Sequence, residues 1–240
     1  MSEKTILIQG AMSVETKLLI DALSDAEKIV LNGYEFYKGK INDCAVVISI
    51  TKVGMINASV ATILGINHFN PKCIINQGVA GGHDKKVHKG DIIIGEFAAN
   101  MNSFKTCSKK EDEGSNPFEW ELITFNEGKD VLKEKIPANI ELVEKSSNVF
   151  EMRNFKIHKG TIVSGDVWNK ECDRINWFVS ELNSLCEDME TFAVYKVCQN
   201  NDVPVLGIRM ISNSEINNES YDRNLANVLQ EKIIEMLCTE

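Results

Sequence analysis

Proline and arginine are scarce in this sequence, and no hydrophobic run approaches the length of a membrane span. The 240 residues include 4 Pro and 4 Arg, with 43% hydrophobic and 25% charged residues. This composition excludes a disordered tail, a Pro-rich or collagen-like fibre and a repeat array. A membrane-spanning helix needs about 20 consecutive apolar residues, so we expect no contact with a membrane.

The N-terminal residues carry no recognisable targeting signal. Residues 1–4 lead directly into the apolar residues 5–8, which are too few for a signal-peptide core and precede no small-residue cleavage site. We therefore expect a cytoplasmic protein. A length of 240 residues suits one globular domain of generous size, and we take residues 1–240 as that domain.

The charge balance is acidic. The chain has 26 Lys and Arg against 35 Asp and Glu, which gives a formal net charge of -9. An acidic surface repels phosphate backbones, and the sequence has no local basic stripe, so we expect no nucleic-acid partner. Because arginines are so few, an arginine in an apolar setting is informative, since a buried guanidinium needs a partner or a function.

Cysteine is present in an odd number and without a metal-binding pattern. The seven cysteines form no C-x-x-C pair and no ligand spacing with the four histidines. In an acidic chain without a leader we interpret them as reduced thiols that fill gaps in the core. We expect neither a metal nor an organic cofactor.

Apolar runs typical of strands alternate with helical patterns along most of the chain. We expect strands at residues 4–9, two or three strands within 29–50, and further strands at 73–77, 91–97, 160–165 and 204–211. We expect helices at residues 13–23, from 56 to about 69, at 190–200 and over the last apolar pattern from 225 to 237. The alternation predicts an α/β fold with a mostly parallel sheet covered by helices.

One stretch does not fit the alternation. Residues 100–127 are charged and rich in turn formers, and we interpret them as a long surface loop of the kind that forms lids or interfaces. Ligands of open α/β sheets collect at the carboxyl ends of the strands. The candidate site segments are therefore 10–12, 52–54, 78–82, 164–166 and 212–213.

Two of these candidates have simple structural explanations. The glycine-rich segment 78–82 lacks the spacing of a dinucleotide or phosphate-binding loop, and a tight turn explains it well. Glu187, Asp188 and Glu190 open a helix, where acids complement the helix dipole. A carboxylate at the same place could instead hold a pair of sugar hydroxyls through charge-assisted hydrogen bonds, and both interpretations stay open.

Arg209 interrupts an apolar strand. A charge inside a buried strand is costly unless it is paired or functional. Arg209 either forms a structural ion pair or takes part in a functional site with Asn213, which lies four residues further on at the strand's end.

Five segments together resemble one family, the 5′-methylthioadenosine/S-adenosylhomocysteine nucleosidases of the purine nucleoside phosphorylase/nucleosidase superfamily. Order and spacing agree over nearly the whole chain. The matching segments are Gly-Ala-Met-Ser-Val-Glu at 10–15, Asn-Gln-Gly-Val-Ala-Gly-Gly at 76–82, Gly-Thr-Ile-Val-Ser-Gly-Asp-Val-Trp at 160–168, Asp-Met-Glu-Thr-Phe-Ala at 188–193 and Pro-Val-Leu-Gly-Ile-Arg-Met-Ile-Ser-Asn at 204–213. The resemblance implies a single α/β domain with a central mixed, twisted sheet flanked by helices.

The resemblance also implies roles for individual residues. Glu15 would polarise the attacking water as general base, and Arg209 would hold Glu15 and the water in place. Glu190 would bind the ribose 2′ and 3′ hydroxyls, with Met189 packed against the ribose. The purine and the 5′-substituent would be enclosed by the remaining site residues, namely Trp168 stacked on the base, Ser212 and Asn213 at N7, Met12, Val53 and Tyr221 around the 5′-group, and Val79 and Gly81 in the glycine segment.

Two positions depart from the family pattern. Val79 stands where the family has Ser or Thr, so a hydroxyl is missing. Asn213 stands where the family has its catalytic Asp, and an amide can hydrogen-bond to N7 but cannot protonate it. An Asn in this role is typical of phosphorylases that act on 6-oxopurines.

The resemblance implies a purine-nucleoside N-glycosidase that hydrolyses the C1′–N9 bond of a 5′-modified adenine nucleoside with water and forms a homodimer. Two alternatives remain open. Asn213 would also suit a 6-oxopurine nucleoside hydrolase or phosphorylase, and a catalytically impaired nucleoside-binding protein is the alternative from another class.

Overall fold

The structure, a computed structural model, describes residues 5–125, 127–152 and 155–237. The first residue of the expected N-terminal strand, Lys4, and the last cysteine, Cys238, lie outside this range, as does Asn126 of the expected loop. Among the helices of the described residues, none combines the length and the apolar composition of a membrane span.

The strands alternate with helices much as the apolar pattern predicts. The helical segments are α1 (Ser13–Asp21), α2 (Met55–Phe69), the short 3₁₀ helix η1 (Pro117–Glu119), α3 (Ile140–Met152), α4 (Cys172–Leu182), α5 (Thr191–Asn200) and α6 (Leu225–Leu237). The strands are β1 (Ile6–Gly10), β2 (Ser24–Leu31), β3 (Tyr34–Ile41), β4 (Cys44–Ile50), β5 (Cys73–Gly82), β6 (Ile92–Asn100), β7 (Phe104–Lys105), β8 (Glu121–Thr124), β9 (Val131–Leu132), β10 (Ile136–Pro137), β11 (Ile157–Ser164), β12 (Ser184–Asp188) and β13 (Val205–Asn213).

The main sheet is mixed and partly closed. Its path runs β10-β6-β11-β12-β5-β1-β4-β3-β2, and β13 pairs with both β5 and β6. Strands β5, β13, β6, β11 and β12 therefore form a closed ring, from which β1, β4, β3 and β2 extend as an open sheet. The α/β fold with a central mixed sheet is confirmed.

The expectation of a mostly parallel sheet was wrong, because several neighbours pair antiparallel. Strands β2, β3 and β4 form an antiparallel meander, and β12 pairs antiparallel with β5. The turn between β2 and β3 contains Asn32 and Gly33, and that between β3 and β4 contains Asn42 and Asp43, all four with positive φ. Two-residue turns of this kind join hairpins.

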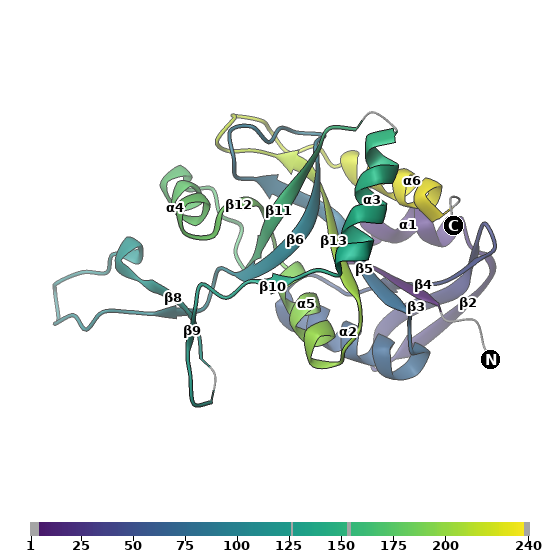
Figure 1. Ribbon diagram of the computed structural model, residues 1–240, viewed down its shortest axis with the longest axis horizontal. Helices are drawn as coiled ribbons and strands as arrows, with labels where there is room; N and C mark the ends of the chain where they lie inside the picture. The colour runs from purple at the N-terminus through teal and green to yellow at the C-terminus, as the bar shows by residue number, and fades with distance from the viewer. Residues whose placement is uncertain (1–4, 126, 153–154, 238–240) are drawn as a thin grey trace.

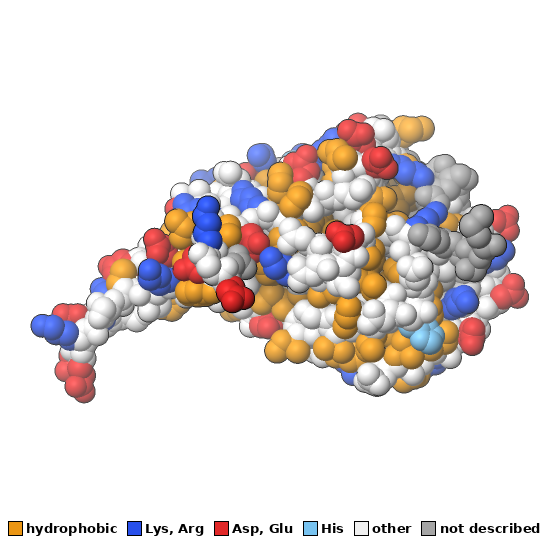
Figure 2. All heavy atoms as spheres, turned by 60° about the horizontal axis from the view of Figure 1, so that its bottom comes forward, with side chains coloured by type: hydrophobic (Ala, Val, Ile, Leu, Met, Phe, Trp, Pro, Cys, Tyr) orange, Lys and Arg blue, Asp and Glu red, His pale blue; other side chains and the backbone are white. Residues whose placement is uncertain are grey.

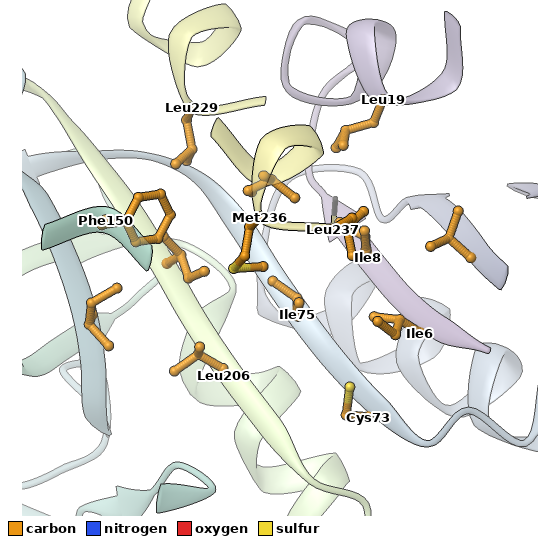
Figure 3. Close-up of a cluster of buried hydrophobic side chains, with 14 of the residues drawn as sticks. Ile6, Ile8, Leu19, Cys73, Ile75, Phe150, Leu206, Leu229, Met236 and Leu237 are labelled. Atoms are coloured by element: carbon orange, nitrogen blue, oxygen red, sulfur yellow. The ribbon is translucent and has the colours of Figure 1, made fainter. Parts of the chain in front are cut away.

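Helices cover both faces of the main sheet. Helices α1, α3 and α6 lie on one face, and α2 and α5 lie together on the other (Figure 1). Buried aliphatic side chains fill the space between the first layer and the sheet, and Figure 3 shows Ile8, Ile75 and Leu206 from the strands facing Leu19, Leu229 and Leu237 from the helices. This core fixes the strands whose ends carry the site.

Strand β5 is longer than the apolar pattern predicts. It continues through Gly78 and Gly82, so this glycine segment is strand and the prediction of a tight turn there was wrong. Gly78 is required by a close approach, because a Cβ at this position would lie 2.5 Å from Glu15 Oε1. The glycines thus allow a side chain to reach the strand's backbone.

Residues 100–127 are not a plain loop. β7, β8 and β9 form a separate three-stranded sheet that protrudes from the body (Figure 1). The Arg174 guanidinium lies 4.8 to 5.9 Å from the ring centres of Phe104, Trp120, Trp177 and Phe178. This aromatic cluster anchors the base of the projection, so the expectation of a surface loop was only partly right.

The described cysteines differ in burial. Cys73, Cys186 and Cys198 are buried, as a core-filling role predicts, Cys44 is half-buried, and Cys107 and Cys172 are exposed. For these two the prediction was wrong, because the short segments around them show no periodic pattern of apolar residues that would predict which side chains are buried.

Candidate active site

A cavity of about 400 Å³ opens at the carboxyl ends of the strands. It collects residues from all five segments that resemble the nucleosidase family, although these are far apart in the chain. Its lining consists of Ala11, Met12, Glu15, Val53, Val79, Ala80, Gly81, Val167, Trp168, Glu187, Asp188, Met189, Glu190, Ser212, Asn213 and Tyr221.

Glu15 is a buried carboxyl held by backbone donors. It lies in the first turn of α1, where the N–H groups of Ala11 and Met12 donate to its Oε2 at 2.9 and 3.0 Å. The N–H of Val79 on β5 donates to Oε1 at 3.1 Å. Burial raises the pKa of Glu15, and the three backbone N–H groups and the charge of Arg209 only partly oppose this shift. A carboxyl with a raised pKa is suited to take a proton from water.

Glu190 is the second buried carboxyl of the cavity. It directly precedes α5, and the N–H of Gly54 donates to its Oε1 at 3.0 Å. Burial and the neighbouring negative charge of Asp188 raise the pKa of Glu190 to about 8. Gly54 has a φ of 101°, so the loop between β4 and α2 needs a glycine to present this N–H.

Asp188 organises the segment around Glu190. Its Oδ1 accepts hydrogen bonds from the Ser164 hydroxyl at 2.5 Å and from the backbone N–H groups of Glu190 and Thr191 at 3.1 and 3.2 Å. Its Oδ2 accepts from Arg209 Nε at 2.7 Å and from the Thr191 hydroxyl. These bonds fix the backbone from which Glu190 projects.

Arg209 does not hold Glu15 as the resemblance implied. Its guanidinium is 2% exposed, pairs with Asp188 and donates to the side chain and carbonyl of Asn76 and to the carbonyl of Ile208. The predicted contact with Glu15 was therefore wrong, and Arg209 acts on Glu15 through its charge. Asp188 uses the guanidinium instead, because its carboxylate is equally buried and needs a counter-charge.

One end of the cavity combines aromatic and amide groups. Trp168 and Tyr221 stand at the rim, 63% and 43% exposed, with their rings 6.0 Å apart in an edge-on arrangement. Deeper in, the Ser212 hydroxyl donates to Asn213 Oδ1 at 3.0 Å, and β5 brings Gly81 alongside Asn213.

The structure brings eleven of the twelve predicted site residues to this cavity, and only Arg209 lies behind it. Sequence reasoning did not assign Asp188 or Glu187 to the site, although it noted the acidic segment that contains them. Asp188 could have been found from Arg209, because a buried guanidinium requires an acidic partner. Among the described residues no group of His, Cys, Asp and Glu is arranged to hold a metal ion.

Comparison with known proteins gives consistent results. The family model of the phosphorylase superfamily matches residues 5–235. The 5′-methylthioadenosine/S-adenosylhomocysteine nucleosidase of Psychromonas ingrahamii is 30% identical over 244 aligned positions, covering 96% of this chain and 98% of the relative.

Solved structures agree in fold. The nucleosidase of the same name from Neisseria meningitidis, in complex with methylthio-immucillin-A, has a TM-score of 0.81 at 21% identity, with 99% and 100% of the two chains covered. Futalosine hydrolase of Helicobacter pylori also has a TM-score of 0.81, at 22% identity, with 98% and 97% covered. Two differently named hydrolases thus share this fold to the same degree.

Proposed function

Because the chain belongs to the phosphorylase superfamily and, within it, to the 5′-methylthioadenosine/S-adenosylhomocysteine nucleosidase family, we propose that it hydrolyses the C1′–N9 bond of a 5′-modified adenine nucleoside. It is an N-glycosidase that acts on a small purine nucleoside. The family model spans nearly the whole chain, which supports taking residues 1–240 as one domain.

The observation that carries this proposal is a pair of buried carboxyls, Glu15 and Glu190, facing one cavity. Cleavage of a C1′–N9 bond passes through an oxocarbenium-like state, which negative charge near the sugar stabilises. Glu190 accepts hydrogen bonds from the ribose hydroxyls, and Glu15 takes a proton from the attacking water. Both side chains are fixed by backbone N–H groups, so their positions need little reorganisation during the reaction.

The other side chains fit the rest of the nucleoside. Trp168 stacks on the purine, and Ser212 and Asn213 contact its N7 edge. Met189 packs against the ribose, while Met12, Val53 and Tyr221 enclose the 5′-substituent, for which an apolar lining is suitable. Val79 and Gly81 contribute backbone rather than side-chain groups.

The co-substrate is water rather than phosphate. Binding a phosphate dianion requires cationic or multiple hydroxyl donors, and the described residues that line the cavity include no Lys or Arg. Arg209 is engaged with Asp188, and Val79 has no hydroxyl. These features support hydrolysis over phosphorolysis.

The protein acts in the cytoplasm as a homodimer without a nucleic-acid partner. Support for the dimer comes from the face formed by α2 and α5, where hydrophobic side chains gather (Figure 2). On this face Ile56 is 76% exposed, and Val53, which precedes α2, is 43% exposed. The negative net charge supports the absence of nucleic acid.

The test is turnover of a nucleoside panel that varies the 5′-group and the sugar, with released base measured by chromatography. We expect adenine release to be fastest with 5′-alkylthio substrates and to fall sharply when the 2′ or 3′ hydroxyl is removed. Binding of these nucleosides without release of base would assign the chain as a nucleoside-binding protein and contradict the proposal.

A further inference from the structure

An acid–imidazole pair that the steps above do not use lies at the base end of the cavity. Glu187 lines the cavity, and its Oε1 accepts the N–H of Asn169 at 3.1 Å. Its Oε2 lies 3.0 Å from Nε2 of His83, which is 1% exposed. His83 Nδ1 lies 2.5 Å from the Ser184 hydroxyl. When this hydroxyl donates to Nδ1, the Nε2–H of His83 donates to Glu187, so the carboxylate is held on both oxygens.

The sheet places Glu187 beside Asn213. Strand β5 lies between β12 and β13, and Gly81 is the register partner of Glu187 on one side and of Asn213 on the other. Residues paired across strands project from the same face. The Cβ that Gly81 lacks would lie 3.6 Å from both Glu187 Cγ and Asn213 Nδ2. A planar base over Gly81 therefore meets the carboxylate and the amide along one edge.

The hydrogen-bonding capacity of these two side chains is complementary to a particular base edge. The Ser212 hydroxyl, shared between Asn213 Oδ1 at 3.0 Å and the Ala80 carbonyl at 3.2 Å, orients the amide, and its Nδ2 is a donor. Glu187 is an acceptor. A base that satisfies both offers acceptors next to Asn213 and an N–H donor next to Glu187. Adenine has an acceptor at N7 but a lone pair at N1, whereas a 6-oxopurine has acceptors at N7 and O6 and a hydrogen at N1.

We propose that this base site also takes 6-oxopurines, so that the enzyme hydrolyses 5′-modified nucleosides of the hypoxanthine type. Glu187 accepts from N1–H, and Asn213 donates to the O6 and N7 edge. The inference rests on the proposed function, because the bond cleaved is the same. The hydroxyl of water adds to C1′, the C1′–N9 electron pair leaves with the base, and the second proton of the water goes to the base.

The experiment compares kcat/KM for 5′-methylthioinosine with that for 5′-methylthioadenosine. We expect this ratio to be one or more in the wild type and to fall about tenfold in Glu187→Met, because the acceptor for N1–H is lost. Asn213→Asp lowers the ratio as well, since a carboxylate would face O6. Glu219→Gln is the matched control, because Glu219 forms its acid–imidazole pair with His88 outside the cavity and the ratio should not change.

A wild-type ratio below one, or a fall of less than threefold in Glu187→Met, overturns the inference while adenine release leaves the proposed function intact. Glu187→Leu, which removes the same acceptor, replaces the Met variant if the latter does not fold, and is judged by the same threshold. If neither nucleoside is cleaved, the proposed function fails, and calorimetric binding of the free bases decides the inference. Tighter binding of hypoxanthine than of adenine, lost in the Glu187 variant, supports it, and any other result overturns it.

Discussion

Two buried carboxyls, those of Glu190 and Glu15, remain protonated in the native protein at pH values at which they are ionised in the unfolded chain. The pKa of Glu190 is raised to about 8 and that of Glu15 is raised as well, both first of all by burial. Between the ordinary carboxyl value of 4.5 and these raised values, the native state binds more protons than the unfolded state. The stabilising contribution of these protonated groups is present at low pH and is lost as the pH rises through the raised pKa of each group, about 8 for Glu190.

We therefore expect the melting temperature to fall between pH 6 and pH 9, and to fall less in Glu190→Gln. One proton bound only by the native state changes the free energy of unfolding by about 1.4 kcal/mol per pH unit, so removing the titrating group flattens the profile measurably. Calorimetry or circular dichroism at several pH values measures this. Equal slopes in the wild type and the variant would show that Glu190 titrates normally.

Glu190→Gln should also reduce catalysis much more than stability. If Glu190 contacts the ribose diol, loss of its charge should cost about 2 to 4 kcal/mol in kcat/KM. Initial rates with 5′-methylthioadenosine and a melting curve at pH 9, above the raised pKa of Glu190, measure the two effects side by side. Unchanged activity, or loss of the fold, would reduce Glu190 to an acid that complements the start of α5.

At the scale of single residues, sequence reasoning located the cavity but not its internal contacts. Motif order was sufficient to select Glu15, Glu190 and Asn213, because each lies in a segment with recognisable spacing. The partner of Arg209 was missed, since Asp188 and Glu15 are both acidic and only the folded backbone shows that Asp188 lies closer. Glu187 was missed because its role depends on register with Gly81 on β5.

Among the elements, strand β5 connects the fold to the chemistry. It carries Gly78 under the Glu15 carboxyl and Gly81 between Glu187 and Asn213. It also pairs with β1, β12 and β13. A side chain added along β5 would therefore displace groups of the site rather than groups at the surface.

Gly78→Ala should impair activity while leaving the fold largely intact. The added Cβ would lie 2.5 Å from Glu15 Oε1, the far end of a flexible side chain, so the carboxylate moves and loses its bond from Val79. We expect kcat/KM to fall at least about tenfold, since one misplaced catalytic group typically costs 10- to 100-fold or more, with a small change in melting temperature. Gly81→Ala, with no contact closer than 3.6 Å, is the control for stability. Full activity in Gly78→Ala would contradict the position given to Glu15.

The elements themselves were predictable to an uneven degree. Buried strands such as β1 and β13 and the amphipathic α6 follow their apolar patterns closely. Helices α3 and α4 were not assigned, because polar residues such as Ser146 and Ser147 occupy buried positions of α3 and break its apolar stripe. In the projection, β7 and β8 have two and four residues. Strands this short do not show the alternation of apolar and polar residues by which a strand is predicted.

For the whole molecule, the proposed dimer accounts for the apolar face of α2 and α5. Ile56→Glu places a charge at the most exposed hydrophobic position of this face. Because burying an unpaired charge is costly, we expect sedimentation at micromolar concentration to shift from twice 26.9 kDa to 26.9 kDa. Ile140→Glu, an equally drastic change on α3 at the opposite face, should leave the dimer intact. A wild-type monomer with full activity would exclude the dimer.

We propose that the cavity directs water, and not phosphate, to C1′. Adenine release from 5′-methylthioadenosine, with the sugar product identified by mass, tests this most directly when it is measured with and without phosphate. We predict equal rates in both conditions and free 5-methylthioribose as the sugar product. A rate that saturates with phosphate, with 5-methylthioribose 1-phosphate as the main product, would contradict the account.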